Sequence, residues 1–177
     1  PVMNGRRYGN LDQSDAVQCL VAVYSPTDMY QLDLCDRTTA EDQAAATDGN
    51  TVRGDTGEKG MGKMHNQLMG VSCMDNPEIA ATGSPIKFVN GNFPPAYFLQ
   101  GVQDRIIPYT QSVSMVRMIN EKCGEGHAEL KLFPNADHGA AEMKTDEEVD
   151  LILDFIDRHI WEGEHLRTPL PKEIALL

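Results

Sequence analysis

The fold is decided by residues 94–108, which read PPAYFLQGVQDRIIP. Two prolines precede a short apolar segment, Tyr97–Leu99, and Gly101 follows it. A short apolar run bounded by Pro and Gly is typical of a buried β-strand. The stretch therefore predicts a strand and, directly after it, a turn that carries the carboxylate of Asp104.

Two further strands are predicted on either side of this stretch. Residues 16–24, AVQCLVAVY, form a nearly continuous apolar run, which indicates a strand covered on both faces. Residues 128–133, AELKLF, place Lys131 outward between apolar neighbours. We expect three strands in all.

Two helices are predicted after the second and third strands. Each has an apolar stripe at helical spacing: Val113, Met115, Val116 and Ile119 in residues 110–122, and Val149, Ile152, Leu153, Ile156 and Ile160 in residues 146–160. Thr145 and Glu148 have the spacing of a capping box, which fixes the start of the second helix. Strands that alternate with helices predict right-handed crossovers and a parallel sheet, so the fold class is α/β.

A long insertion, residues 29–93, separates the first strand from the second. It is polar and weakly periodic, apart from a short helical turn in NPEIAATGSP. We interpret it as a cap over a site at the carboxyl edge of the sheet, with a disordered surface excursion as the alternative. The proline-interrupted tail, residues 161–177, is expected to wrap the surface or meet a partner.

Composition excludes several classes of protein. The 177 residues are 41% hydrophobic and 24% charged, as expected for one globular domain, and no apolar run approaches a membrane span of roughly 18 residues. The formal net charge of −12 disfavours binding to a phosphate backbone. We therefore expect neither a nucleic acid nor a membrane as partner.

The four cysteines, Cys19, Cys35, Cys73 and Cys123, include no CxxC pair. This spacing disfavours a zinc ribbon or a thioredoxin-type motif and predicts mostly free thiols. A Cys35–Cys73 disulfide is the alternative, because both residues fall in the same irregular region.

Asp104 and His138 are the candidate catalytic residues. Each follows one of two consecutive predicted strands, and sites in open parallel sheets form beyond the carboxyl ends of strands. Taken singly, Asp104 is also an ordinary turn residue and His138 an ordinary loop residue. Taken together, in the order acid then histidine, they match the orienting half of a Ser-His-Asp triad.

Between Asn10 and Ile160 the chain resembles the carboxyl-terminal portion of α/β-hydrolase esterases, notably the group of bacterial feruloyl and acetyl esterases. The resemblance is carried by NLDQS leading into VQCLVAVYSPTDM, by NPEIAATGSPIKFV, by PPAYFLQGVQDRIIPYTQS and by LKLFPNADHG. The family segment G-x-x-D-x-x-V-P maps to Gly101, Asp104, Ile107 and Pro108, and the H-G segment maps to His138. The resemblance implies hydrolysis of small-molecule esters, such as acetyl or cinnamoyl groups on plant polysaccharides, without a metal or organic cofactor.

The chain departs from the family pattern at its nucleophile. No G-x-S-x-G elbow is present, and the nearest segment, Gly70–Met74, lacks the second glycine. Ser25, Ser72 and Ser84 are interpreted as loop and turn residues, and the H-G-G oxyanion motif is also missing. Because the family order is Ser, acid, His, we expect the nucleophile upstream of Pro1, on an N-terminal half present as a separate chain or fragment.

The remaining expectations concern three individual residues and the alternatives to an esterase function. Ser25 replaces a usual Gly, Asp28 is interpreted as structural, and Asp137 would raise the pKa of His138 if it pointed inward. The alternatives are a prolyl-oligopeptidase-type peptidase, a catalytically inactive relative used for binding, and a fragment with no function of its own. Association into a homo-oligomer is left open.

Overall fold

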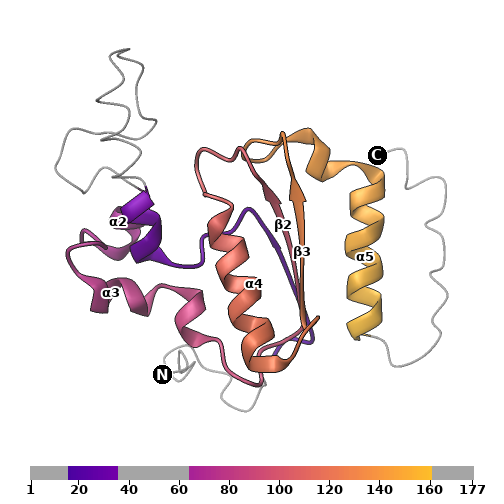
Figure 1. Cartoon of the computed structure of the whole chain (residues 1–177), viewed down its shortest axis with the longest axis horizontal. Helices are drawn as coiled ribbons and strands as arrows, with labels where there is room; N and C mark the ends of the chain where they lie inside the picture. Colours follow the sequence, from indigo (N-terminus) through magenta and orange to yellow (C-terminus); the bar gives the residue numbers. More distant parts are fainter. Residues whose placement is uncertain (1–15, 36–63, 161–177) are drawn as a thin grey trace, which may run out of the picture.

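A computed structural model describes residues 16–35 and 64–160 (Figure 1). Its elements in chain order are β1 Leu20–Val23, α2 Met64–Met69, α3 Pro77–Thr82, the 3₁₀ turn η2 Pro85–Phe88, β2 Ala96–Gly101, α4 Thr110–Cys123, β3 Ala128–Phe133, the 3₁₀ turn η3 Ala141–Lys144 and α5 Asp146–Ile160. Residues 29–35 are also helical. The expected tail, residues 161–177, lies outside the described residues.

The sheet has three parallel strands in the order β1-β2-β3. Val21 pairs with Tyr97, and Tyr97 pairs with Glu129 in the next strand. The α/β class and the parallel sheet predicted from sequence are confirmed. Only Leu20–Val23, in the second half of the apolar run 16–24, forms a strand, while β3 has the predicted bounds.

One face of the sheet is covered by α4. The hydrophobic core on this face consists of buried residues from the strands and from α4: Ala22, Ala96, Phe98, Met115, Ile119 and Ala128. The predicted stripe of this helix is correct for Met115 and Ile119 but wrong for Val113, which is 37% exposed. Gln111 and Ser112 are buried instead, because their side chains hydrogen-bond Thr27 and Gln100.

The opposite face of the sheet is covered by α5, as Figure 1 shows. The buried residues of this layer are Tyr97, Leu99 and Phe155, with Ile152 packed beside them. The predicted stripe of α5 is therefore only partly correct. Val149, Leu153 and Ile160 are exposed, because the sheet contact is made by the adjacent face of the helix, through Ile152 and Phe155.

The start of α5 forms half of the predicted capping box. The Glu148 backbone N–H donates to the Thr145 hydroxyl at 3.3 Å. The Glu148 carboxylate does not return to Thr145, because Lys131 on β3 donates to it. This ion pair raises the pKa of Lys131 and ties the first turn of the helix to the sheet.

The described parts of the insertion pack around a buried carboxylate. Asp33, on the helical residues 29–35, accepts hydrogen bonds from Asn66 Nδ2 at 3.2 Å and from the Met74 backbone N–H at 2.8 Å. Asp28 begins this helix by accepting the backbone N–H groups of Tyr30 and Gln31, which confirms its structural role. All four cysteines are free, so the alternative disulfide is absent.

Candidate active site

Asp104 and His138 meet beyond the carboxyl ends of β2 and β3. His138 Nδ1 lies 2.9 Å from Asp104 Oδ2, and a carboxylate accepts, so Nδ1 carries the proton of this hydrogen bond. The Asp104 side chain is fully buried, whereas the His138 side chain is 28% exposed. The second ring nitrogen, Nε2, is thus the one that a reacting group can use.

Four donors hold the Asp104 carboxylate. Oδ1 accepts the backbone N–H groups of Ile106 and Ile107, each at 2.8 Å. Oδ2 accepts Gln100 Nε2 at 2.9 Å in addition to His138. A buried carboxylate with its acceptor positions filled cannot swing away from the imidazole without leaving several donors unpaired.

Gln100 is a site residue that the sequence analysis missed. It is fully buried at the penultimate position of β2, and its side-chain amide also donates to Ile107 O at 3.0 Å. The Ser112 hydroxyl on α4 in turn donates to Gln100 Oε1 at 3.0 Å. A polar residue inside the apolar run YFLQG was the signal that would have found it, because buried amides need partners.

Gly101 allows the two loops to approach each other. A Cβ at this position would lie 2.3 Å from the Ala136 carbonyl oxygen, which is backbone and cannot move aside cheaply. Backbone hydrogen bonds seal the junction: Val102 N donates to Phe133 O at 2.9 Å, and Gln103 N to Ala136 O at 3.1 Å. The glycine of the G-x-x-D segment is therefore required by close packing.

Asp137 clamps the two loops together. Its Oδ1 accepts the backbone N–H of Arg105 at 3.1 Å and that of His138 at 2.8 Å, while the Arg105 guanidinium binds Oδ2. These hydrogen bonds hold the pKa of Asp137 well below its usual range. The bond from the Arg105 guanidinium has the largest effect, and the two backbone N–H groups add to it. The carboxylate thus points at Arg105 and at the backbone rather than inward at the imidazole.

Tyr24, directly after β1, has its ring against the His138 ring. The two ring centroids lie 4.3 Å apart, with a 55° angle between the planes. Its φ of +43° is outside the range that tyrosine ordinarily adopts. The sequence offers no signal for this contact, which depends on how the chain turns at the end of β1.

The serines weighed earlier have structural partners. Ser72 donates to Asp75 at 2.7 Å and Ser84 to Ala80 O at 2.7 Å, while Ser25 makes only a local contact with Val23 O. Within residues 16–35 and 64–160, no serine hydroxyl donates to His138. In the same residues, no three His, Cys, Asp or Glu side chains gather as metal ligands would, and no helix could cross a membrane.

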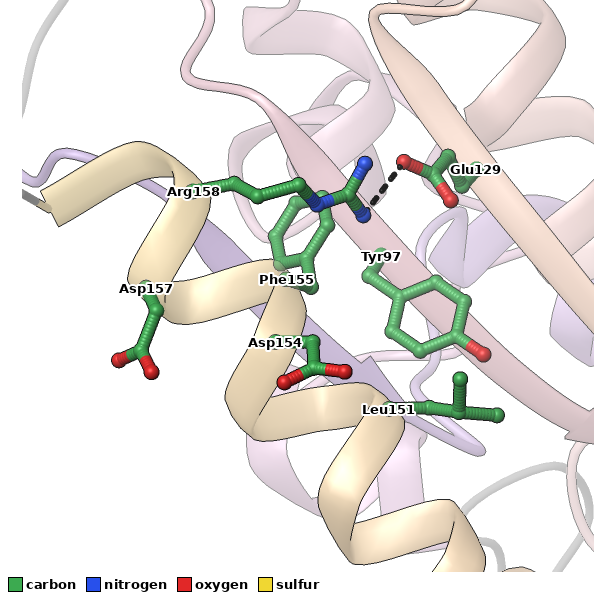
Figure 2. Close-up of a pocket in the computed structure, with 7 residues that line it drawn as sticks. All are labelled: Tyr97, Glu129, Leu151, Asp154, Phe155, Asp157 and Arg158. Atoms are coloured by element: carbon green, nitrogen blue, oxygen red, sulfur yellow. Dashed lines mark hydrogen bonds and ion pairs between the residues drawn. The ribbon is translucent and has the colours of Figure 1, made fainter. Parts of the chain in front are cut away.

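A cavity of about 510 Å³ lies between α5 and the amino-terminal halves of β2 and β3. Figure 2 shows Arg158 of α5 reaching Glu129 of β3 beside Tyr97. Asp104 and His138 follow the opposite ends of these strands, so this cavity is separate from the candidate site. The chemistry of the pair, not cavity size, identifies the site.

The sequence of the chain matches a known protein family. The sequence pattern of the BD-FAE family matches residues 3–119, which is more than half of the chain; the match includes Asp104 and ends before His138. A comparison with curated protein sequences found no match.

Several solved structures share the fold. The bifunctional GH43-CE protein of Bacteroides eggerthii has a TM-score of 0.61 at 21% identity, over 85% of this chain and 18% of that one. A truncated carbohydrate esterase from gut microbiota has a TM-score of 0.59 at 20% identity, over 86% and 46% of the two chains. The acylaminoacyl peptidase of Pyrococcus horikoshii has a TM-score of 0.57 at 14% identity, over 93% and 23%. The chain thus spans less than half the length of these structures.

Proposed function

The chain belongs to the BD-FAE family of α/β-hydrolase-like esterase domains, and on this premise we propose that it carries the acid and the base of a serine carboxylesterase. The observation that supports this most is the 2.9 Å contact between His138 Nδ1 and the buried Asp104. It leaves Nε2 of a partly exposed imidazole without a proton, in the tautomer that accepts one. Asp104 and His138 are the proposed catalytic residues.

In the proposed reaction, His138 Nε2 removes the proton from a serine hydroxyl as that oxygen attacks the ester carbonyl. The imidazolium that forms is stabilised by Asp104 and returns its proton to the leaving alcohol. The resulting acyl-enzyme is hydrolysed by water, which His138 activates in the same way. The substrates would be small-molecule esters of the acetyl or cinnamoyl type.

We propose that the nucleophile is supplied by a partner polypeptide, the N-terminal half of the same hydrolase as a separate chain or fragment. The engaged serines support this, and so does β1, which pairs only with β2 among the described residues. An unpaired strand edge is a template for pairing with another chain. The exposed apolar residues of α5, Val149, Leu153 and Ile160, offer further surface for the same partner.

The test is to treat the protein, purified from its source, with a fluorophosphonate, which phosphonylates reactive serines with loss of fluoride. A labelled serine on a co-purifying polypeptide is expected, together with hydrolysis of aryl acetates that is lost in His138→Ala. The absence of any labelled serine, together with the absence of ester turnover, would reject the proposal.

A peptidase is the second candidate, because the fold is shared with the acylaminoacyl peptidase of Pyrococcus horikoshii. Parallel assays with aryl esters and with acylated peptide amides separate the two. Faster turnover of the amides would favour the peptidase.

A further inference from the structure

Tyr24 has a backbone conformation that few residues other than glycine adopt. In residues 16–35 and 64–160 it is the one non-glycine residue with a positive φ, at +43°. Left-handed backbone crowds Cβ against a neighbouring carbonyl, and Gly or Asn tolerates it far better than a bulky residue. Such strain persists where the surrounding structure enforces it, often beside a functional site.

The left-handed turn changes where the Tyr24 ring lies. Leu20 and Ala22 pack on the α4 side of the sheet, so an extended residue 24 would point to that side as well. The ring lies against His138 instead, with the centroids 4.3 Å apart. The Tyr24 backbone N–H still donates to Leu99 O at 2.9 Å, so β1 and β2 anchor the residue that reaches the imidazole.

The ring contact complements the hydrogen bond to Asp104. That bond restrains one atom of the imidazole, Nδ1, and leaves the ring free to tilt about it. The tilted contact with the Tyr24 ring opposes this motion, since aromatic pairs favour such offset and tilted geometries. Both contacts together fix the direction in which Nε2 points.

We propose that Tyr24 is a positioning residue that holds the His138 imidazole, so that Nε2 faces the nucleophile. The inference rests on the proposed function for its catalytic meaning, but its structural part concerns only these two rings. Tyr24 acts through His138 and is not itself assigned a step in the reaction. The strained backbone is explained because an unstrained residue 24 would not bring the ring to this place.

The test compares Tyr24→Asn with Tyr24→Phe in the full chain. Asn accepts the left-handed backbone but removes the ring, while Phe retains the ring and loses only the hydroxyl. The readout is the ¹⁵N and ¹H NMR signal of the His138 imidazole, assigned by its disappearance in His138→Ala. We expect Tyr24→Asn to raise solvent exchange of the Nδ1 proton by up to about tenfold, the weight of one aromatic pair. Tyr24→Phe is expected to match the wild type.

Ester turnover by the hydrolase that contains the nucleophile provides the second readout. A lower kcat in Tyr24→Asn with little change in KM, restored by Phe, is the expected result. If Tyr24→Asn leaves both the His138 signal and kcat unchanged while the wild type is active, the positioning role is wrong and the proposed function stands. If the His138 signal changes but neither wild type nor variant hydrolyses esters, the positioning role stands and the proposed function fails.

Discussion

Asp104 and Asp33 each have a histidine side chain beside the carboxylate, and the difference between the two pairs shows what makes such a contact a candidate for catalysis. Asp104 and His138 are 2.9 Å apart beyond the ends of two strands, and the histidine is 28% exposed. Asp33 and His65 are 3.6 Å apart within the insertion, where the side chains are 0% and 8% exposed. Proximity is shared, but only the first pair presents its histidine to solvent at a strand end.

The surroundings of Asp33 are those of a structural centre. Its carboxylate joins the helical residues 29–35 to Asn66 and Met74, which lie far along the chain. Burial and, to a lesser extent, the charge of Asp33 raise the pKa of the neighbouring Cys73 thiol. A thiol that stays protonated is a poor nucleophile. The hydrogen bonds of Asp33 hold the described parts of the insertion together.

The two pairs are expected to differ most when each histidine is replaced in turn. His138→Ala is expected to lower ester turnover by about 10⁶-fold, because base and acid are lost together. His65→Gln, its matched control, is expected to leave turnover close to the wild-type value. The measurement is kcat in the hydrolase that contains the nucleophile; an equal loss in both variants would remove the distinction between the pairs.

The two aspartates provide the next largest contrast. Asp104→Asn is expected to lower kcat by about 10³- to 10⁴-fold, because the amide no longer favours the productive imidazole tautomer. Asp33→Asn is expected to leave kcat nearly unchanged. A loss below tenfold in Asp104→Asn would mean that another acid orients His138.

A measurement of stability tests the structural role of Asp33. Asp33→Ala leaves a buried amide and a backbone N–H without their acceptor, which costs about 2–4 kcal/mol of unfolding free energy. The measurement is urea denaturation of the full chain. A destabilisation below about 0.5 kcal/mol, the usual range for surface substitutions, would show that Asp33 does not organise the insertion.

Replacing Gln100 tests how much its hydrogen bond to Asp104 contributes to the candidate catalytic pair. Gln100→Leu removes one donor from Asp104 and leaves the Ser112 hydroxyl without its acceptor. We expect kcat to fall by about tenfold, since one hydrogen bond to a charged group is lost. Ser112→Ala, which keeps the donor to Asp104, is the control, and an equal fall in its kcat would contradict the role given to Gln100.

The smallest expected effect concerns Asp137 and pH. Because Arg105 lowers the folded-state pKa of Asp137, the clamp stabilises the protein above the unfolded-state pKa of about 3.9 and loses this effect as pH falls below it. Asp137→Asn should therefore differ from wild type most at neutral pH and at low salt, and least in strong acid. Denaturation series across this range provide the check; a difference that grows in acid would contradict the assignment.

Sequence patterns predicted the elements that local chemistry decides. The alternation in residues 128–133 and the boundary at Gly124 fixed β3 and the end of α4 correctly. The prediction of the buried face of α4 was partly wrong, because apolar periodicity cannot show that Gln111 and Ser112 have polar partners elsewhere in the fold. Packing between elements, rather than propensity, selects that face.

The acid and the histidine were found because each follows a strand of the same sheet. Their supports were not found. Tyr24 and the Arg105–Asp137 pair act through contacts between segments distant in sequence. Gln100 lies only four residues before Asp104, and its signal, a polar residue inside an apolar run, was overlooked. Asp137 was noticed as unusual, but its direction depends on where Arg105 lies in space. Local patterns locate reactive side chains better than they locate the groups that hold them.

The absence of a side chain at Gly101 links two segments that a sequence comparison would treat as independent. The carbonyl of Ala136 occupies the space that any other residue at 101 would need. A 134–140 loop transplanted from a related protein must therefore be moved together with the end of β2 that it packs against. Mutational scans of the 134–140 loop alone will underestimate how much variation the pair of segments tolerates when both change at once.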